Sequence, residues 1–115
     1  MLFNPELTIW LYNTTTDMRK SIDGLSVLVS SVMEKNPTKG GELFLFYNRN
    51  NDKLKILYWD KKGFCLWYKR LVKGRFKIPK GGANSMSYEQ LRWLLDGLDI
   101  ENLQPNPRLN YENFY

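Results

Sequence analysis

The residues of this 115-residue chain best suited to bind a ligand are basic and aromatic, and they are concentrated in one stretch. From Arg49 to Lys80 there are 11 lysine and arginine residues against two aspartates, whereas the rest of the chain is net negative. Tryptophans and tyrosines are interleaved with these cations. Positive charge binds phosphates, and flat rings stack on bases. The pattern is typical of a polyanion-binding surface, although many ordinary protein surfaces are also basic.

Two β-patterned runs on either side of the sequence DKKG place these residues on a hairpin. The runs are residues 53–59 and 64–71, both rich in β-branched, aromatic and other apolar residues. We expect the three residues between Asp60 and Phe64 to form a loop with Gly63 in the left-handed conformation, so that Asp60 pairs with Phe64. A two-residue loop that pairs Asp60 with Gly63 would shift the register by one residue, so this prediction depends on Gly63.

The expected register divides the hairpin into an apolar face and a basic aromatic face. On the basic face Lys55 would lie directly opposite Lys69, and like charges so placed are unfavourable unless an anion lies across them. Trp59 and Trp67 would lie beside this pair, where they could stack on bases. In the alternative interpretation, the tryptophans pack beneath a helix while the lysine ammonium groups reach water. The apolar face would hold Leu54, Ile56, Tyr58, Leu66 and Tyr68, and the basic face Lys53, Lys55, Trp59, Cys65, Trp67 and Lys69.

A second basic element is expected directly after the hairpin. Residues 75–78 are predicted to form a short fourth strand that Pro79 ends. Because Lys73, Arg75 and Lys77 alternate, they would share one face and could each neutralise a phosphate. A solvated edge strand protected by charges would show the same alternation. The full set predicted to contact DNA is Lys53, Lys55, Trp59, Lys61, Lys62, Trp67, Lys69, Arg70, Lys73, Arg75 and Lys77.

Several kinds of chemistry are disfavoured by what the sequence lacks. It has no histidine, the commonest general base and metal ligand, and its single cysteine, Cys65, offers neither a disulfide partner nor a ligand pair. The aspartates fall in expected helices and turns, where capping or solvation accounts for them. We therefore expect no catalytic residue, no metal and no cofactor. No apolar run is long enough to cross a bilayer and no leader peptide is visible, so we expect a cytoplasmic protein without membrane contact.

The hairpin must be supported by further strands and two helices. Residues 8–12 are β-rich, and residues 42–47 form the continuous apolar run of a buried strand. Ser87 and Gln90 form a capping box before a second helix that ends near Gly97. Single apolar stripes predict the first helix, to about Lys35, from Met18, Ile22, Leu25, Val29 and Val32, and the second from Leu91, Leu94, Leu95 and Leu98.

The order of these elements predicts a single α+β domain over residues 1–115. We expect an antiparallel sheet of four to five strands with two helices packed on one face, the apolar face of the hairpin. Residues 100–115 are expected to lie over the domain as an extended C-terminal tail. On the second helix Trp93 projects away from the leucine stripe. It is either covered by that tail or presented as an anchor for a protein partner.

Three stretches of sequence also carry a family resemblance: MRKSIDGL (18–25), LFLFYNRNNDKLKILYWDKKGFCLWYKRL (43–71) and QLRWLLDGLDI (90–100). They resemble the TnpB accessory family of insertion-sequence family sixty-six, and they span nearly the whole chain. The most specific block is KILYWDKKGFCLWYKRL, 17 consecutive residues of unusual aromatic and basic composition. The resemblance implies a protein of a bacterial mobile element, encoded beside a transposase that carries the catalytic residues, with an auxiliary and non-enzymatic role in DNA transposition.

Two mechanisms are compatible with such a role. In the first, the basic hairpin and residues 75–78 hold DNA phosphates near the transposase, either non-specifically or near the ends of the element. In the second, the chain is a protein-only adaptor that binds the transposase through Trp93 and the tail without touching DNA.

Overall fold

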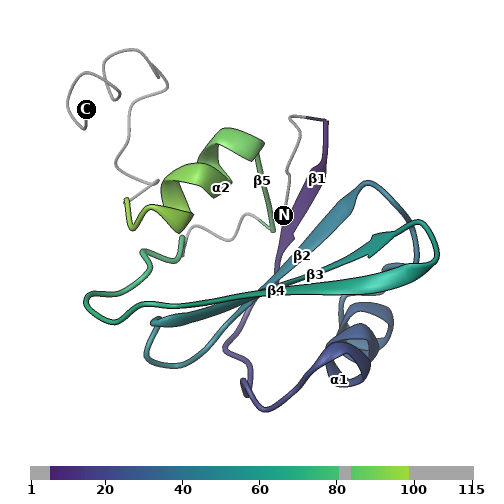
Figure 1. The fold of residues 1–115 in the computed structure, drawn as a ribbon, viewed down its shortest axis with the longest axis horizontal. Coiled ribbons are helices and arrows are strands. Elements are labelled where there is room, and N and C mark those ends of the chain that lie inside the picture. The colour runs from purple at the N-terminus through teal and green to yellow at the C-terminus, as the bar shows by residue number, and fades with distance from the viewer. Residues whose placement is uncertain (1–5, 81–83, 99–115) are drawn as a thin grey trace.

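The computed structural model describes residues 6–80 and 84–98, which are built around a five-stranded sheet (Figure 1). The strands lie in the order β4-β3-β2-β1-β5, and among them only β1 and β2 are parallel neighbours. The α+β class and the five strands confirm the sequence prediction, but the sheet is mixed rather than antiparallel. The strands are β1 (Thr8–Leu11), β2 (Glu42–Tyr47), β3 (Lys53–Asp60), β4 (Gly63–Arg70) and β5 (Ser85–Met86).

The parallel pairing of β1 with β2 requires a crossover, which the first helical segment supplies. It consists of α1 (Ile22–Val27) followed directly by the π-helix η1 (Leu28–Val32). The wider π turn rotates the apolar stripe expected from the sequence. Val32 is consequently 55% exposed, and Met33 packs against the core in its place.

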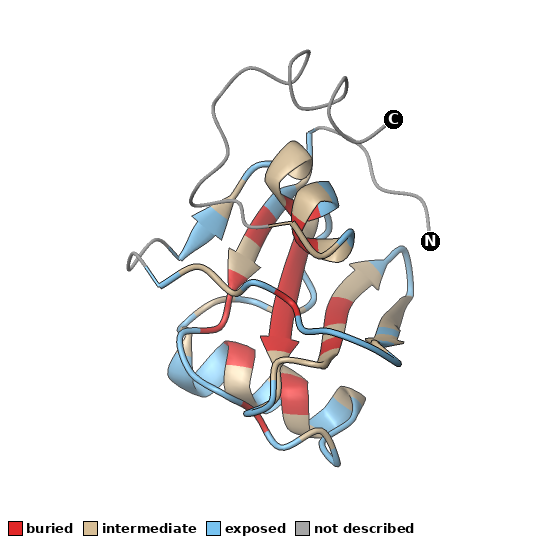
Figure 2. Ribbon diagram, turned by 90° about the vertical axis from the view of Figure 1, so that its left-hand side faces the viewer, coloured by how far each residue is buried: buried red, intermediate tan, exposed pale blue. Residues whose placement is uncertain are grey.

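The two helical segments lie on opposite faces of the sheet, so the prediction that both pack on one face is wrong (Figure 1). On one face Leu25 and Val29 of the first segment pack against Phe44 of β2. On the other, Leu91 and Leu94 of α2 (Tyr88–Leu95) are buried in a separate apolar cluster. Figure 2 shows buried residues on the central strands and on the inward sides of both helical layers. The sequence of β2 is continuously apolar because both faces of this strand are covered.

The second helix begins at the predicted capping box. The Oγ of Ser87 accepts a hydrogen bond from the Gln90 amide at 3.1 Å, and the Gln90 side chain accepts one from the Ser87 amide at 2.9 Å. Gly97, with φ of 81°, follows the helix in the left-handed conformation. The tail expected at residues 100–115 lies outside the described residues. Within the described ranges, no helix combines the length and the apolar character needed to cross a bilayer.

Candidate nucleic-acid interface

The register of the central hairpin differs from the expected one. Asp60 pairs with Gly63 rather than Phe64, so the loop has two residues, and Lys61 adopts the positive φ (59°) that was expected of Gly63. The shift moves every β4 side chain to the other face relative to β3. Trp59 therefore lies opposite Phe64, and Trp67 lies opposite Ile56 on the other face. The predicted face that combines both tryptophans with the lysines does not form.

Lys55 and Lys69 are not the opposed pair that the sequence suggested, because Lys55 pairs with Tyr68 and Lys69 with Leu54. The ammonium group of Lys55 donates hydrogen bonds of 2.8 Å to the carbonyl oxygens of both Met18 and Lys20, in the segment that leads into α1. It also lies 5.5 Å from the ring centroid of Tyr68. Lys55 therefore fastens the first helical segment to the sheet rather than facing a ligand.

Lys69 has the equivalent position on the opposite face. Its ammonium group donates a 2.9 Å hydrogen bond to the carbonyl oxygen of Leu95, the last residue of α2. A cation is favourable there because the last carbonyls of a helix lack partners within it and carry partial negative charge. Both lysines thus satisfy backbone carbonyls next to the helices that cover the sheet, Lys55 before α1 and Lys69 at the end of α2.

The two tryptophans of the hairpin contribute to packing on separate faces. Trp67 is half-buried and packs against the cluster beneath α2. Trp59 is also half-buried, and its ring meets that of Phe64 edge to face, with 5.0 Å between centroids. The alternative interpretation, in which the tryptophans serve the fold, describes Trp67 well.

Residues 75–78 do not form the predicted fourth strand. The segment after β4 instead lies against the turn between β2 and β3, where the Leu71 amide bonds to the Asp52 carbonyl (2.8 Å) and the Phe76 amide to the Asn51 carbonyl (2.6 Å). Phe76 is buried in the cluster beneath α2, a core position that the charge alternation around it does not predict. Arg75 and Lys77, on either side of it, are exposed. The side chains of Arg75 and Lys77 are therefore exposed on either side of the buried Phe76 ring, in a segment that is irregular rather than a strand.

These contacts gather cations at one end of the sheet, which we call the basic end. The β2–β3 turn, the last residue of β4 and the segment after it meet there. Lys53 lies directly opposite Arg70, so a pair of opposed cations does exist, in a different place from the predicted one. Residues 49–53 and 70–80 contain one acid, Asp52, whose carboxylate accepts a hydrogen bond from Asn48. The basic end comprises Arg49, Lys53, Arg70, Lys73, Arg75 and Lys77.

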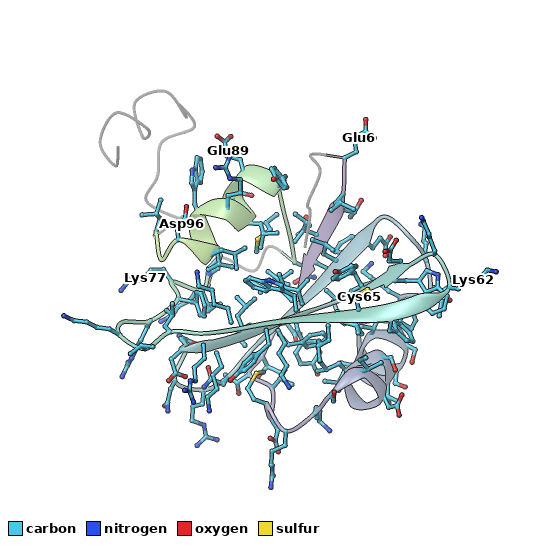
Figure 3. All side chains as sticks on the ribbon, viewed as in Figure 1. Glu6, Lys62, Cys65, Lys77, Glu89 and Asp96 are labelled. Carbon is cyan, nitrogen blue, oxygen red and sulfur yellow. The ribbon has the colours of Figure 1, made fainter. Side chains whose placement is uncertain are left out.

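The other predicted cations lie elsewhere. Lys61 and Lys62 form the loop at the far end of the hairpin, and Figure 3 shows Lys62 and Lys77 at opposite ends of the molecule. Trp93 is half-buried on α2, and it belongs to neither of the apolar clusters found among the described residues. Whether the C-terminal tail covers Trp93 concerns residues outside the described ranges. The residues predicted to contact DNA are therefore divided among the basic end, the distant hairpin loop, the structural lysines Lys55 and Lys69, and two tryptophans. Trp93, predicted to bind a protein partner, lies apart from them on α2.

A cavity that the sequence does not predict adjoins the basic end. It has a volume of about 390 Å³ and lies where the parallel strands β1 and β2 end, beside the β2–β3 turn. Burial raises the pKa of the Tyr47 phenol on its wall. No local signal marks such a site, because it depends on a parallel pairing between distant segments. Its lining is Leu11, Tyr12, Asn13, Thr15, Tyr47, Arg49, Asn51, Ile78, Pro79, Lys80 and Asn84.

Acidic residues do not converge in the described part of the chain. No group of three or more aspartate, glutamate or cysteine side chains lies close enough there to hold a metal ion. Asp17 is instead paired with Arg19, whose side chain donates hydrogen bonds of 3.1, 3.0 and 2.6 Å to its carboxylate. These bonds hold the pKa of the Asp17 carboxyl at about 2.

Comparison with known proteins identifies the family. The family model described as IS66 Orf2 like protein matches residues 7–105. The uncharacterized protein y4hO of Sinorhizobium fredii is 41% identical over 98 residues, which are 84% of each chain. The uncharacterized protein y4jC of the same organism is 35% identical over 103 residues, covering 88% of this chain and 87% of its own. No solved structure matches. The chain therefore belongs to the IS66 Orf2-like family, the TnpB accessory proteins that its sequence motifs resemble.

Proposed function

We propose that this protein is a non-catalytic accessory factor of a bacterial insertion sequence, which assists DNA transposition by a separately encoded transposase and contacts DNA through its basic end. Family membership supports the place in transposition. The main observation in favour of DNA contact is that the basic end holds six cations and one acid, with Lys53 directly opposite Arg70. Opposed cations are unfavourable in the free protein, and a phosphate between them would remove that cost.

The basic end suits the backbone of DNA better than it suits base recognition. Arg70 is exposed at the end of β4, and Lys73 and Arg75 are exposed on the irregular segment after it, with no helix among them that could enter a major groove. Side chains of this kind bind phosphates independently of sequence and release counterions from the DNA. Val72 is fully exposed among them and adds a small apolar contact at the same surface.

The test is a titration of the full chain into labelled duplex DNA at several salt concentrations. One duplex comes from the ends of the insertion sequence and one has random sequence. A variant with Lys73→Gln, Arg75→Gln and Lys77→Gln should reduce the slope of log affinity against log salt by about 2 to 3, since each lost phosphate contact removes roughly 0.9. All three side chains are exposed, so folding should be unchanged.

The matched control carries Lys61→Gln and Lys62→Gln in the distant loop, which should leave the slope near that of the wild type. Equal effects of the two variants would reject the basic end as the contact surface. Failure of the wild type to bind either duplex at low salt would reject DNA contact altogether.

The second candidate is a protein-only adaptor, and Trp93 is the observation that favours it. A half-buried tryptophan that joins neither apolar cluster within residues 6–80 and 84–98 is suited to anchor a partner. We propose the transposase of the same element as that partner. If the protein is such an adaptor, the Trp93→Ala variant should not associate with the purified transposase in a pull-down assay. The variant with Lys73→Gln, Arg75→Gln and Lys77→Gln should associate with it as the wild type does. Wild-type association of the Trp93→Ala chain would reject the role of this side chain.

A further inference from the structure

The cavity beside the basic end has the chemistry of an anion site. Two cations, Arg49 and Lys80, line it, and its described lining contains no aspartate or glutamate. Three asparagines, at positions 13, 51 and 84, add amides that can both donate and accept hydrogen bonds. A ligand that enters the cavity would thus meet both positive charge and amide groups that donate and accept hydrogen bonds.

The remaining walls are apolar and aromatic. Leu11, Ile78 and Pro79 provide aliphatic surface, and Tyr12 and Tyr47 provide rings. Tyr47 is half-buried and packs against the cluster beneath α2, so its ring is held in place when a ligand arrives. A ligand that matches these walls has a flat, polar ring joined to an anionic group, which is the chemistry of a nucleotide.

The position and size of the cavity restrict the form of that nucleotide. A volume of about 390 Å³ is near the lower limit of the roughly 300–1,000 Å³ of small-molecule sites, so it admits one nucleotide and not a stacked base pair. Arg49 belongs both to the cavity lining and to the basic end. A DNA strand bound along the basic end would therefore pass the mouth of the cavity.

We propose that this cavity binds one unpaired nucleotide of a DNA strand, with its phosphate against Arg49 and Lys80 and its base against Tyr47. The asparagine amides contact the edge of the base. This proposal rests on the DNA contact described above and adds to it a preference for DNA with an unpaired end. Such ends arise where a transposase leaves a staggered break.

The experiment compares two labelled hairpin DNAs with the same duplex, one blunt and one with a 3′ overhang of six thymidines. The full chain should bind the overhang form about 10-fold more tightly, since the unpaired strand adds the stacking of one base on an aromatic ring. The double variant Asn13→Ala and Arg49→Gln, at two exposed positions, should lose this preference. The matched control Lys77→Gln, which is exposed and does not line the cavity, should weaken both DNAs equally and keep the preference.

The outcomes separate the two proposals. Salt-dependent binding of both DNAs without a preference for the overhang overturns the cavity proposal and leaves the DNA contact in place. No binding of either DNA overturns both. A preference that the Asn13→Ala and Arg49→Gln variant retains places the unpaired strand elsewhere and also overturns the cavity proposal. Thymidine monophosphate, titrated alone by calorimetry, should bind far more weakly than the overhang. Equal affinity would show a site for free nucleotides instead.

Discussion

Replacing Lys55 with methionine distinguishes a structural lysine from a DNA-binding one. The substitution leaves an unbranched side chain only one atom shorter and removes the two 2.8 Å hydrogen bonds to the carbonyls of Met18 and Lys20. A hydrogen bond from a charged donor contributes about 1.5–3 kcal/mol, and the bond to Lys20 counts for less because it is exposed. We expect the free energy of unfolding to fall by about 2–4 kcal/mol, out of roughly 5–15 kcal/mol for a domain of this kind.

The assay is equilibrium unfolding in urea, read by tryptophan fluorescence, together with the salt-dependent DNA titration. Lys62→Met is the matched control, because Lys62 is exposed in the hairpin loop and should change stability by no more than about 0.5 kcal/mol. Under native conditions the salt slope of the Lys55→Met variant should equal that of the wild type. Unchanged stability combined with a slope reduced by about 0.9 would refute the structural role and restore Lys55 to the DNA-binding set.

Three further substitutions test the fold. Phe76→Ala removes a ring that is 1% exposed and should cost about 3–5 kcal/mol of unfolding free energy in urea, whereas Lys77→Ala beside it should cost almost none. Ser87→Ala should cost about 1 kcal/mol by the same measurement, because the capping bond to the Gln90 amide is lost, and a cost near zero would show that water replaces it. Arg19→Ala should return the Asp17 pKa in a carboxylate NMR titration from about 2 towards its ordinary 3.8. Because the pKa is lowered in the folded state, any stability from this pair is present above about pH 4 and lost as the pH falls towards 2, and an unchanged titration would contradict the pairing.

The sequence predicted the elements of this fold better than their arrangement. The first four strand runs and the capping box have local causes, namely residue type and spacing, and they appear where expected, whereas residues 75–78 form no strand. The hairpin register has a cause that the sequence does not show. Both faces of the sheet are covered, so Leu66 can be buried on one face as readily as Trp67 on the other. The apolar pattern then fits either register, and Gly63 was a misleading guide because Lys61 adopts the positive φ.

The placement of the helices could have been inferred from β2. Leu43 and Leu45 belong to one cluster, while Phe44 and Phe46 belong to the other. A strand with no polar face needs a layer on each side, which requires the helices to be separated.

The predicted site was only partly recovered, because the partners of a lysine are not visible in a sequence. Lys55 bonds to carbonyls 37 and 35 residues away, and Lys69 to one 26 residues away. No spacing rule connects such positions, so both lysines resembled their exposed neighbours. The opposed cations at Lys53 and Arg70 were missed for a different reason, because one residue of register decides which side chains face each other.

The parallel strand β1 also has a consequence for the order of folding. Strands β2, β3 and β4 are joined by short turns and can form as a local meander, whereas β1 must close a long crossover before it pairs. We expect its docking to be a late step, and its amides to exchange with solvent before those of β3. Since Leu11, the last residue of β1, and the residues that follow it line the cavity, a nucleotide bound there would stabilise the docked state selectively. Slower hydrogen exchange of the β1 amides on adding DNA would then show that the cavity is occupied, although β1 itself contains none of the basic residues.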